Sequence, residues 1–279
     1  MVIELATQFQ SYVDEKFTTE AKKALVTNND FDWTGAHSIK IYKIETSKMN
    51  DYDRAGTGSG KSGSRYGEVS SLDATIEEMT LRKDRSFTFA IDKLDDDETK
   101  RTLQAAKALE RQIREIVIPE IDTYVFGEMV KGAGQLGTPG ELNAKNIYDK
   151  IISASAELDN AEVPEDGRSL IVTPAVYLLM KKNSDIVLNT DIGENMRIRG
   201  VIGNLDGANI IKVPANRLPE KFGFMLCHSV ATVAPQKLED YKIHEDPPGI
   251  SGSLVEGRIC YDAFVLDNKK KAIYYQALA

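Results

Sequence analysis

The first strong hydrophobic pattern along the chain is an alternation of apolar and polar residues, which is typical of β-strands. It occurs at residues 39–44 and again over residues 75–91. The stretch between them, residues 46–67, contains five glycines and many small polar residues, so it cannot bury enough apolar surface to order itself. We therefore predict one long β-hairpin over residues 37–92, bent near residues 83–85, whose tip is ordered mainly by its neighbours.

The next pattern has the spacing of an amphipathic helix. Acidic residues 95–98 suit the positive N-terminal end of a helix, and apolar residues then recur at helical spacing as far as Tyr124. Pro119 lies inside this pattern, where proline removes one backbone hydrogen bond and crowds the preceding turn. We predict a long helix over residues 96–131, with a kink or a break and restart at Pro119.

The remainder of the chain mixes helical and strand patterns. Helical spacing covers residues 143–160 and, after a favourable first proline at Pro174, residues 175–182. Short apolar runs predict strands at 168–173, 200–203, 208–213, 222–226, 241–245, 254–266 and 272–276. The order of these elements indicates an α/β insert over residues 140–238. We expect the strands that follow the insert to pack on the apolar face of the long helix.

Composition and charge narrow the possible functions. The chain has 279 residues, is 42% hydrophobic and carries a net charge of −8, which disfavours a dedicated nucleic-acid binder with a basic surface. Cys227 and Cys260 fit small apolar residues in a reducing compartment. The chain starts without a signal-peptide pattern, and no stretch approaches the roughly 20 apolar residues of a membrane span. We predict a soluble protein, made in the cytoplasm, with no membrane partner.

One motif has the composition of a nucleotide-binding loop. Residues 55–62 fit the relaxed pattern that ends in Gly-Lys-Ser, with Lys61 placed for phosphate oxygens and Ser62 for magnesium. Such a loop follows a buried strand and opens a helix whose dipole faces the phosphate. Residues 48–54 are not a buried strand, and residues 63–67 do not begin a helix. We interpret the motif as a hairpin tip, with a nucleotide-binding enzyme as a remote alternative.

The other candidates for chemistry are isolated side chains. Adjacent Cys227 and His228 would point to opposite faces of a strand, which disfavours a nucleophile and its base. Residues 95–97 favour helix-start electrostatics over a metal site, and Lys269–Lys271 favour a solvated turn over a phosphate clamp. Metal-ligand spacing is missing among the three histidines, His37, His228 and His244. We predict no catalytic, cofactor-binding or metal site, and therefore no enzyme.

Several stretches, taken in order, resemble the major capsid proteins of tailed bacteriophages, whose fold is shared with the shells of encapsulin nanocompartments. The resemblance covers nearly the whole chain and rests on the order and spacing of the stretches. They are Arg85–Asp92, Val117–Asp122, Leu158–Pro164, Gly167–Pro174, Val233–Glu239 and Gly257–Val265.

The resemblance implies an α+β fold, the phage major capsid fold, in four parts. They are an N-terminal arm over residues 1–36, an extended β-hairpin loop over 37–92, a peripheral domain with the spine helix over 93–139 plus 239–279, and an α/β axial domain over 140–238.

The resemblance also implies a function. The chain would self-assemble, through pentamers and hexamers, into the icosahedral head shell that encloses the genome of a tailed bacteriophage or prophage. It would be found in the virion after assembly in the host bacterial cytoplasm, with a portal, a possible decoration protein and a separate scaffolding protein or none as partners. It would enclose DNA without binding it specifically. An encapsulin-like compartment shell is the alternative.

Two finer expectations concern assembly. Some relatives cross-link a lysine to an asparagine of a neighbour with a glutamate as base; Lys48 or Lys61 and Asn268 have suitable residue types, but no motif identifies them. We also expect that deleting residues 1–30 or 50–66 blocks shells and leaves a folded subunit, because a lone helix or two-stranded hairpin is marginal in water.

Overall fold

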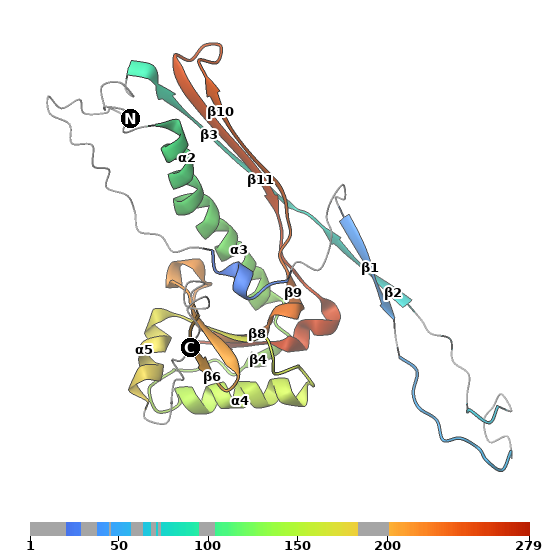
Figure 1. Cartoon of the computed structure of the whole chain (residues 1–279). Helices are drawn as coiled ribbons and strands as arrows, with labels where there is room; N and C mark the ends of the chain where they lie inside the picture. The colour runs from blue at the N-terminus through green and yellow to red at the C-terminus, as the bar shows by residue number, and fades with distance from the viewer. Residues whose placement is uncertain are drawn as a thin grey trace. The chain divides into compact units, whose positions relative to one another are not determined.

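The computed structural model describes residues 21–28, 38–44, 46–56, 64–67, 71, 74–94, 104–183 and 201–279, and Figure 1 traces the chain. The chain divides into two compact units, a hairpin unit of residues 35–80 and a body formed by residues 1–34 and 81–279. The acidic residues 95–97 and the first turns of the predicted long helix lie outside the described residues.

The hairpin unit is built on two antiparallel strands. β1 (Ser38–Ile44) pairs with β2 (Ala74–Thr80) along their whole length, which confirms the strand predicted at residues 39–44. Tyr42 lies opposite Ile76 in this ladder, and Lys40 forms an ion pair of 3.7 Å with Glu78 next to it on the same face.

The predicted return strand of the hairpin is in fact two strands with different partners. β2 ends at Thr80, and β3 (Lys83–Asp92) pairs with β11 (Gly252–Tyr261) of the body instead of β1. The single hairpin predicted over residues 37–92 is therefore wrong beyond residue 80. Alternation identifies a strand and its two faces, but it does not identify a partner that is distant in sequence.

The long helix contains a wider turn at the position where proline was expected to disturb it. α2 (Ala105–Gln112) runs into a π-helical turn, η2 (Ile113–Val117), and then into α3 (Ile118–Lys131). The Ile118 N–H donates to the Ile113 carbonyl, five residues back. Pro119 has no N–H to offer, and its ring would crowd the carbonyl four residues earlier. The widened turn accommodates the proline while the helix continues, so the predicted disturbance is a π-turn.

The body contains a three-stranded antiparallel sheet in the order β10-β11-β3, beside the long helix in Figure 1, and a six-stranded mixed sheet in the order β4-β13-β8-β5-β7-β6. A short pair, β9 (Thr232–Val233) and β12 (Phe264–Val265), lies between them in the chain. The strands not yet bounded are β4 (Gln135–Gly137), β5 (Arg168–Val172), β6 (Val201–Leu205), β7 (Ala208–Lys212), β8 (Phe222–His228), β10 (Gln236–Glu245) and β13 (Ile273–Ala277).

Both faces of the six-stranded sheet are covered. Ile171, Met225 and Ile273 point into one hydrophobic core with α3. Their neighbours Leu170 and Phe224 point into a second core with α4 (Ile147–Asn160) and α5 (Pro174–Lys182). This alternation makes β5 and β8 fully buried strands, and it explains the continuous apolar runs in their sequences.

The helices and strands predicted for the α/β insert are present, but its sheet also contains two strands from outside residues 140–238. Strands predicted at 168–173, 208–213 and 222–226 and helices predicted at 143–160 and 175–182 are confirmed within a few residues. The six-stranded sheet also takes in β4 and β13, from either side of residues 140–238. The expectation that the strands after the insert pack on the long helix holds for Ile273, which lies in the core of α3. The strand that carries it also pairs with β8 and β4 in this sheet, which was not predicted.

Candidate functional site

The hairpin unit presents apolar side chains to solvent. Tyr42 is 68% exposed and Ile76 is 55% exposed, and they face each other across the strands. Towards the tip, the rings of Tyr52 and Tyr66 make an edge contact at 5.0 Å between centroids. The Asp53 N–H donates to the Arg65 carbonyl at 2.9 Å. The two sides of the tip therefore meet, and the unit displays aromatic and aliphatic side chains to solvent.

The segment before the Gly-Lys-Ser motif contains no strand, since residues 46–56 are irregular with one turn. Lys61 and Ser62 themselves lie outside the described residues. A buried strand leading into the motif, which phosphate binding requires, is missing from the described residues before it.

A buried carboxylate holds the chain where it enters the body after the hairpin. Asp262, 1% exposed, accepts hydrogen bonds from the Arg82 N–H at 2.8 Å and from Arg82 Nε at 3.4 Å. Its other oxygen accepts from the Tyr124 hydroxyl of α3 at 2.7 Å and from the Ala263 N–H at 2.8 Å. Asp262 thus joins the body segment that directly follows the hairpin unit, the long helix and the end of β11, a junction that we name the hairpin root.

One face of α3 extends the hairpin root along β3. Glu120 accepts from Arg85 Nε at 2.8 Å and from the Tyr261 hydroxyl at 3.1 Å. One turn later, the Lys83 ammonium lies 5.0 Å above the ring of Tyr124. Burial, and then the hydrogen bond to Asp262, raise the pKa of Tyr124. The basic start of β3 thus lies on an acidic and aromatic face of the helix.

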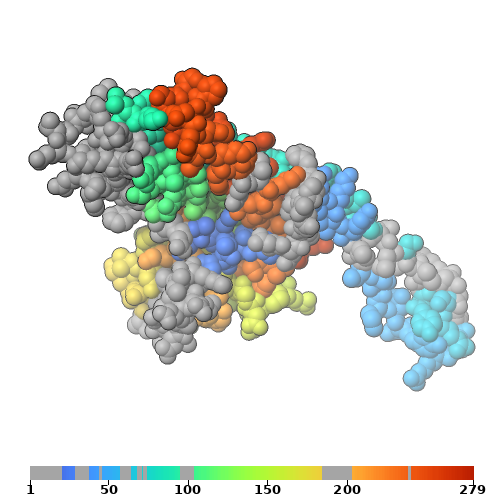
Figure 2. Space-filling model, turned by 45° about the horizontal axis from the view of Figure 1, so that its top comes forward, coloured from blue at the N-terminus to red at the C-terminus, as the bar shows by residue number. Residues whose placement is uncertain are grey.

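A second buried carboxylate holds the N-terminal segment. Asp122 of α3 is fully buried and accepts from the backbone N–H groups of Lys22 at 3.0 Å and Lys23 at 3.3 Å, and from Arg217 Nη1 at 2.8 Å. Val26, also fully buried, belongs to the core of α3, and Asn28 bridges to Val233 of β9. In Figure 2 residues 21–28 are the blue patch beside the green of the long helix. We name this junction the arm root.

The side chains considered for catalysis lie in other parts of the body. The buried Cys227 thiol donates to the Ser169 carbonyl at 3.7 Å, and burial raises its pKa to about 12. His228 donates to the Asp166 carbonyl and accepts from the Val230 N–H, so the backbone takes up both ring nitrogens. Lys270 pairs with Asp267 at 2.7 Å. His37 lies outside the described residues.

Within the described part of the chain, no three His, Cys, Asp or Glu side chains gather as a metal site. No helix among the residues with a described structure is both long and apolar enough to cross a membrane.

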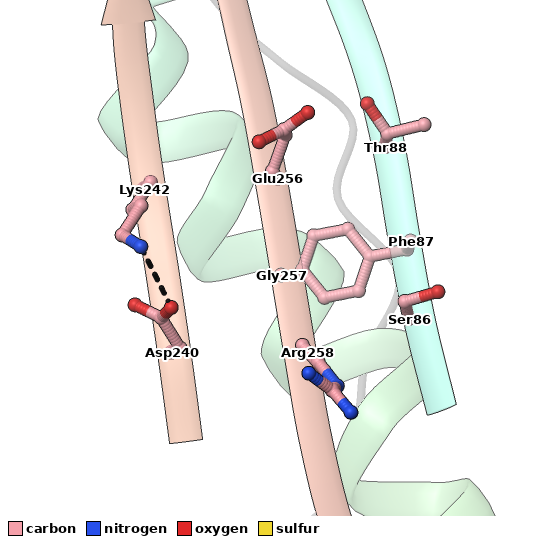
Figure 3. Close-up of a pocket in the computed structure, with 8 residues that line it drawn as sticks. All are labelled: Ser86, Phe87, Thr88, Asp240, Lys242, Glu256, Gly257 and Arg258. Carbon is pink, nitrogen blue, oxygen red and sulfur yellow. Dashed lines mark ion pairs between the residues drawn. The ribbon is translucent and has the colours of Figure 1, made fainter. Parts of the chain in front are cut away.

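The outer face of the three-stranded sheet carries an open groove of about 420 Å³ (Figure 3). Each cationic side chain that lines it faces an anion: Lys242 lies 2.8 Å from Asp240, and Arg258 lies 2.6 Å from Asp84, which is outside the groove. The Arg258 hydrogen bond lowers the pKa of Asp84. Because each cation already faces an anion, the groove has the character of a solvated sheet surface.

Asp122 and Asp262 are functional candidates that the sequence pattern did not predict. Each interrupts an apolar stretch, Asp122 after Ile121 in the helix and Asp262 between Tyr261 and Ala263. A charged residue at a position that the pattern marks as buried needs partners, and this was the available signal.

Comparison with known proteins identifies the fold. No protein-family model matches the sequence, and no curated protein matches it. Among solved structures, one from Mycobacterium phage Che8 has a TM-score of 0.74 at 20% identity, covering 97% of this chain and 96% of that one. The mature capsid of bacteriophage PhiM1 has a TM-score of 0.74 at 14% identity, covering 100% and 92%.

A more distant similarity involves a virus-like particle from Pyrococcus furiosus, with a TM-score of 0.51 at 13% identity and 86% of each chain covered. The phage structures match more of the chain and match it more closely. The fold of this chain is therefore the α+β capsid fold of tailed bacteriophages, as the sequence predicted.

Proposed function

We propose that this chain is a major capsid protein, which self-assembles into the icosahedral head shell around the genome of a tailed bacteriophage or prophage. The observation that carries the proposal is similarity over almost the entire length, from 97% to 100% of this chain, to phage structures that include a mature capsid. The hairpin unit adds independent support, because its exposed Tyr42 and Ile76 form apolar surface that a second subunit could cover.

The proposal assigns a role to each part of the chain. Residues 1–36 are the arm and the hairpin of residues 37–80 is the extended loop, and both hold neighbouring subunits. β3 (Lys83–Asp92), which pairs with β11, belongs with the peripheral domain. Residues 93–139 plus 239–279 form the peripheral domain, and residues 140–238 the axial domain of pentamers and hexamers. The pairing of β4 and β13 favours moving these two strands to the axial part.

Partners and location follow from the same proposal. The protein assembles in the host bacterial cytoplasm and ends in the virion, with a portal, and with a scaffolding or decoration protein where the phage encodes one. It has no enzymatic role and needs no cofactor. A net charge of −8 suits a wall that encloses DNA without holding its phosphates.

Electron microscopy of the purified full-length chain at high concentration, with sedimentation to measure the assembled fraction, tests the proposal. We expect closed particles built from pentamers and hexamers. A chain that stays monomeric over the whole range of concentration and ionic strength would contradict it.

The compartment shell is a second candidate because of the similarity to the Pyrococcus furiosus particle. The two candidates differ in contents. Mass spectrometry of particles isolated from the native host should find DNA and other virion proteins for a phage head. One abundant enclosed enzyme would favour the compartment.

The remote alternative, a nucleotide-binding enzyme that uses residues 55–62, makes an opposite prediction. We expect no binding of labelled ATP with magnesium, and an unchanged assembled fraction for Lys61→Ala. Micromolar binding that Lys61→Ala abolishes would establish a nucleotide site.

A further inference from the structure

The arm root and the hairpin root lie on one turn of α3. Asp122, which holds the N-terminal segment, and Tyr124, which donates to Asp262, are two residues apart in this helix. At about 100° per residue, their side chains leave the helix on sides about 200° apart. The segment between the arm and the hairpin is therefore tied to one side of this helical turn, and the segment that follows the hairpin is tied to the opposite side.

We propose that Asp122 and Asp262 are positioning groups, which fix the points where the N-terminal arm and the extended hairpin join the body. The inference rests on the proposed shell function. It adds that subunits engage their neighbours correctly because both reaching segments start from fixed points on one rigid helix.

Burial makes each carboxylate a fixed point. Asp122 is 0% exposed and Asp262 is 1% exposed. A buried carboxylate that loses its donors is strongly unfavourable, so its donors must stay in place. Each oxygen of Asp262 accepts at least one hydrogen bond of 2.8 Å or less, and Asp122 bonds through both oxygens. Exposed ion pairs, such as that of Lys93 with Asp246 at 3.6 Å, offer no comparable constraint.

The nature of the donors shows what is being positioned. Asp122 holds the backbone N–H groups of Lys22 and Lys23, and Asp262 holds the backbone N–H of Arg82. A bond to the backbone fixes the path of the chain whatever the side chain does. The Arg82 side chain is itself 62% exposed, and it reaches Glu128 only at 4.0 Å. The backbone bond to Asp262 is therefore the main constraint at the hairpin root.

Hydrogen exchange of the full-length unassembled subunit, measured by mass spectrometry, tests the local effect. In Asp262→Asn, exchange over residues 81–84 should rise about tenfold, because one acceptor becomes a donor, while exchange in β8 should change by less than about twofold. Asp122→Asn should have the same effect over residues 22–28 only. Asp240→Asn, at an exposed paired carboxylate, is the matched control and should change neither segment.

The assembled fraction of the same variants tests the consequence. Both buried-site variants should lose at least about half of the wild-type yield of closed particles, and Asp240→Asn should keep it. Tyr124→Phe removes one donor from Asp262 without changing the charge, and it should give an intermediate loss.

Three results would overturn the inference: exchange that rises equally in β8, exchange that does not rise at the roots, or loosened roots with full assembly. If the wild-type chain forms no particles, the shell function fails, and the exchange pattern still decides whether the two carboxylates fix the roots.

Discussion

The hairpin unit and the body use similar strands in opposite ways. In the hairpin unit, Tyr42 and Ile76 face each other across β1 and β2 and remain more than half exposed. In the body, every residue of β5 and β8 is buried. A two-stranded hairpin is marginally stable in water, whereas a sheet covered by helices on both faces is not. The body therefore gains its order within one subunit, and the hairpin retains apolar surface for another.

This contrast separates two kinds of substitution. Changes in the body should lower the stability of the unassembled subunit. Changes on the hairpin face should leave that stability alone and lower the assembled fraction. The four predictions that follow test this separation.

Arg217→Met should cause the largest loss of subunit stability. It leaves the buried Asp122 carboxylate without its cation, at a cost of about 3–5 kcal/mol, and lowers the melting temperature by roughly 10 °C. Calorimetry of the unassembled subunit measures the shift. Arg258→Met, at the exposed pair with Asp84, is the control and should leave the melting temperature nearly unchanged. Equal shifts in the two variants would contradict the prediction.

Deletion of residues 1–28 should lower stability by about 3 kcal/mol, because it removes buried Val26 from the core and two donors from Asp122. Deletion of residues 1–20 spares both and should cost less than about 1 kcal/mol. The truncated subunit should still fold, as expected for removal of residues 1–30, but with lower stability. Denaturant titration of the two proteins gives the comparison, and indistinguishable midpoints would show that residues 21–28 contribute nothing.

Gly257→Ala should cost about 1–3 kcal/mol through overpacking. A Cβ at this position would lie 2.4 Å from the Phe87 ring and 2.8 Å from that of Tyr241, which meet across the glycine. Adding Phe87→Leu should recover part of the loss. Gly127→Ala in α3, where the Cβ would meet open space, is the control and should stabilise the helix by about 0.5–1 kcal/mol. Thermal melts of all three variants decide the outcome.

The double change Tyr42→Ser and Ile76→Thr should have the smallest effect on the subunit, within about 0.5 kcal/mol, because both side chains are already exposed. The assembled fraction measured by sedimentation should nevertheless fall. Lys40→Gln, on the same face, leaves the apolar pair in place and should assemble normally. A folded double variant that assembles as well as wild type would remove the hairpin face from the interface.

Local patterns predicted most of the elements and few of their partners. The continuous apolar runs of β5 and β8 predicted buried strands, because both of their faces lie in a core. The apolar alternation of β3 predicted a strand equally well. It could not show that the partner is β11, far along the chain, instead of the adjacent β1.

The roots were harder to predict for a related reason. Asp122 and Asp262 draw their donors from distant segments, Lys22 in one case and Arg82 in the other. A sequence can mark a buried charge as unusual, but the fold supplies its partners. The sequence predicted where Pro119 disturbs the helix, but it did not predict that the disturbance is a π-turn. A kink and a π-turn both relieve the same crowding, so the pattern cannot distinguish them.

The π-turn also changes the direction in which the side chains on its two sides point around the long helix. One extra residue in η2 offsets the side chains of α2 from those of α3 by about 100°. α2 meets β11 of the three-stranded sheet, and Ile121, Val125 and Met129 of α3 pack into the core of the six-stranded sheet. Deleting a single residue from 113–117 should remove this offset, so that α2 and α3 form one regular helix. The α2 side chains would then rotate by about 100° away from β11. The number of residues in this stretch therefore sets the direction in which the side chains of α2 point relative to those of α3.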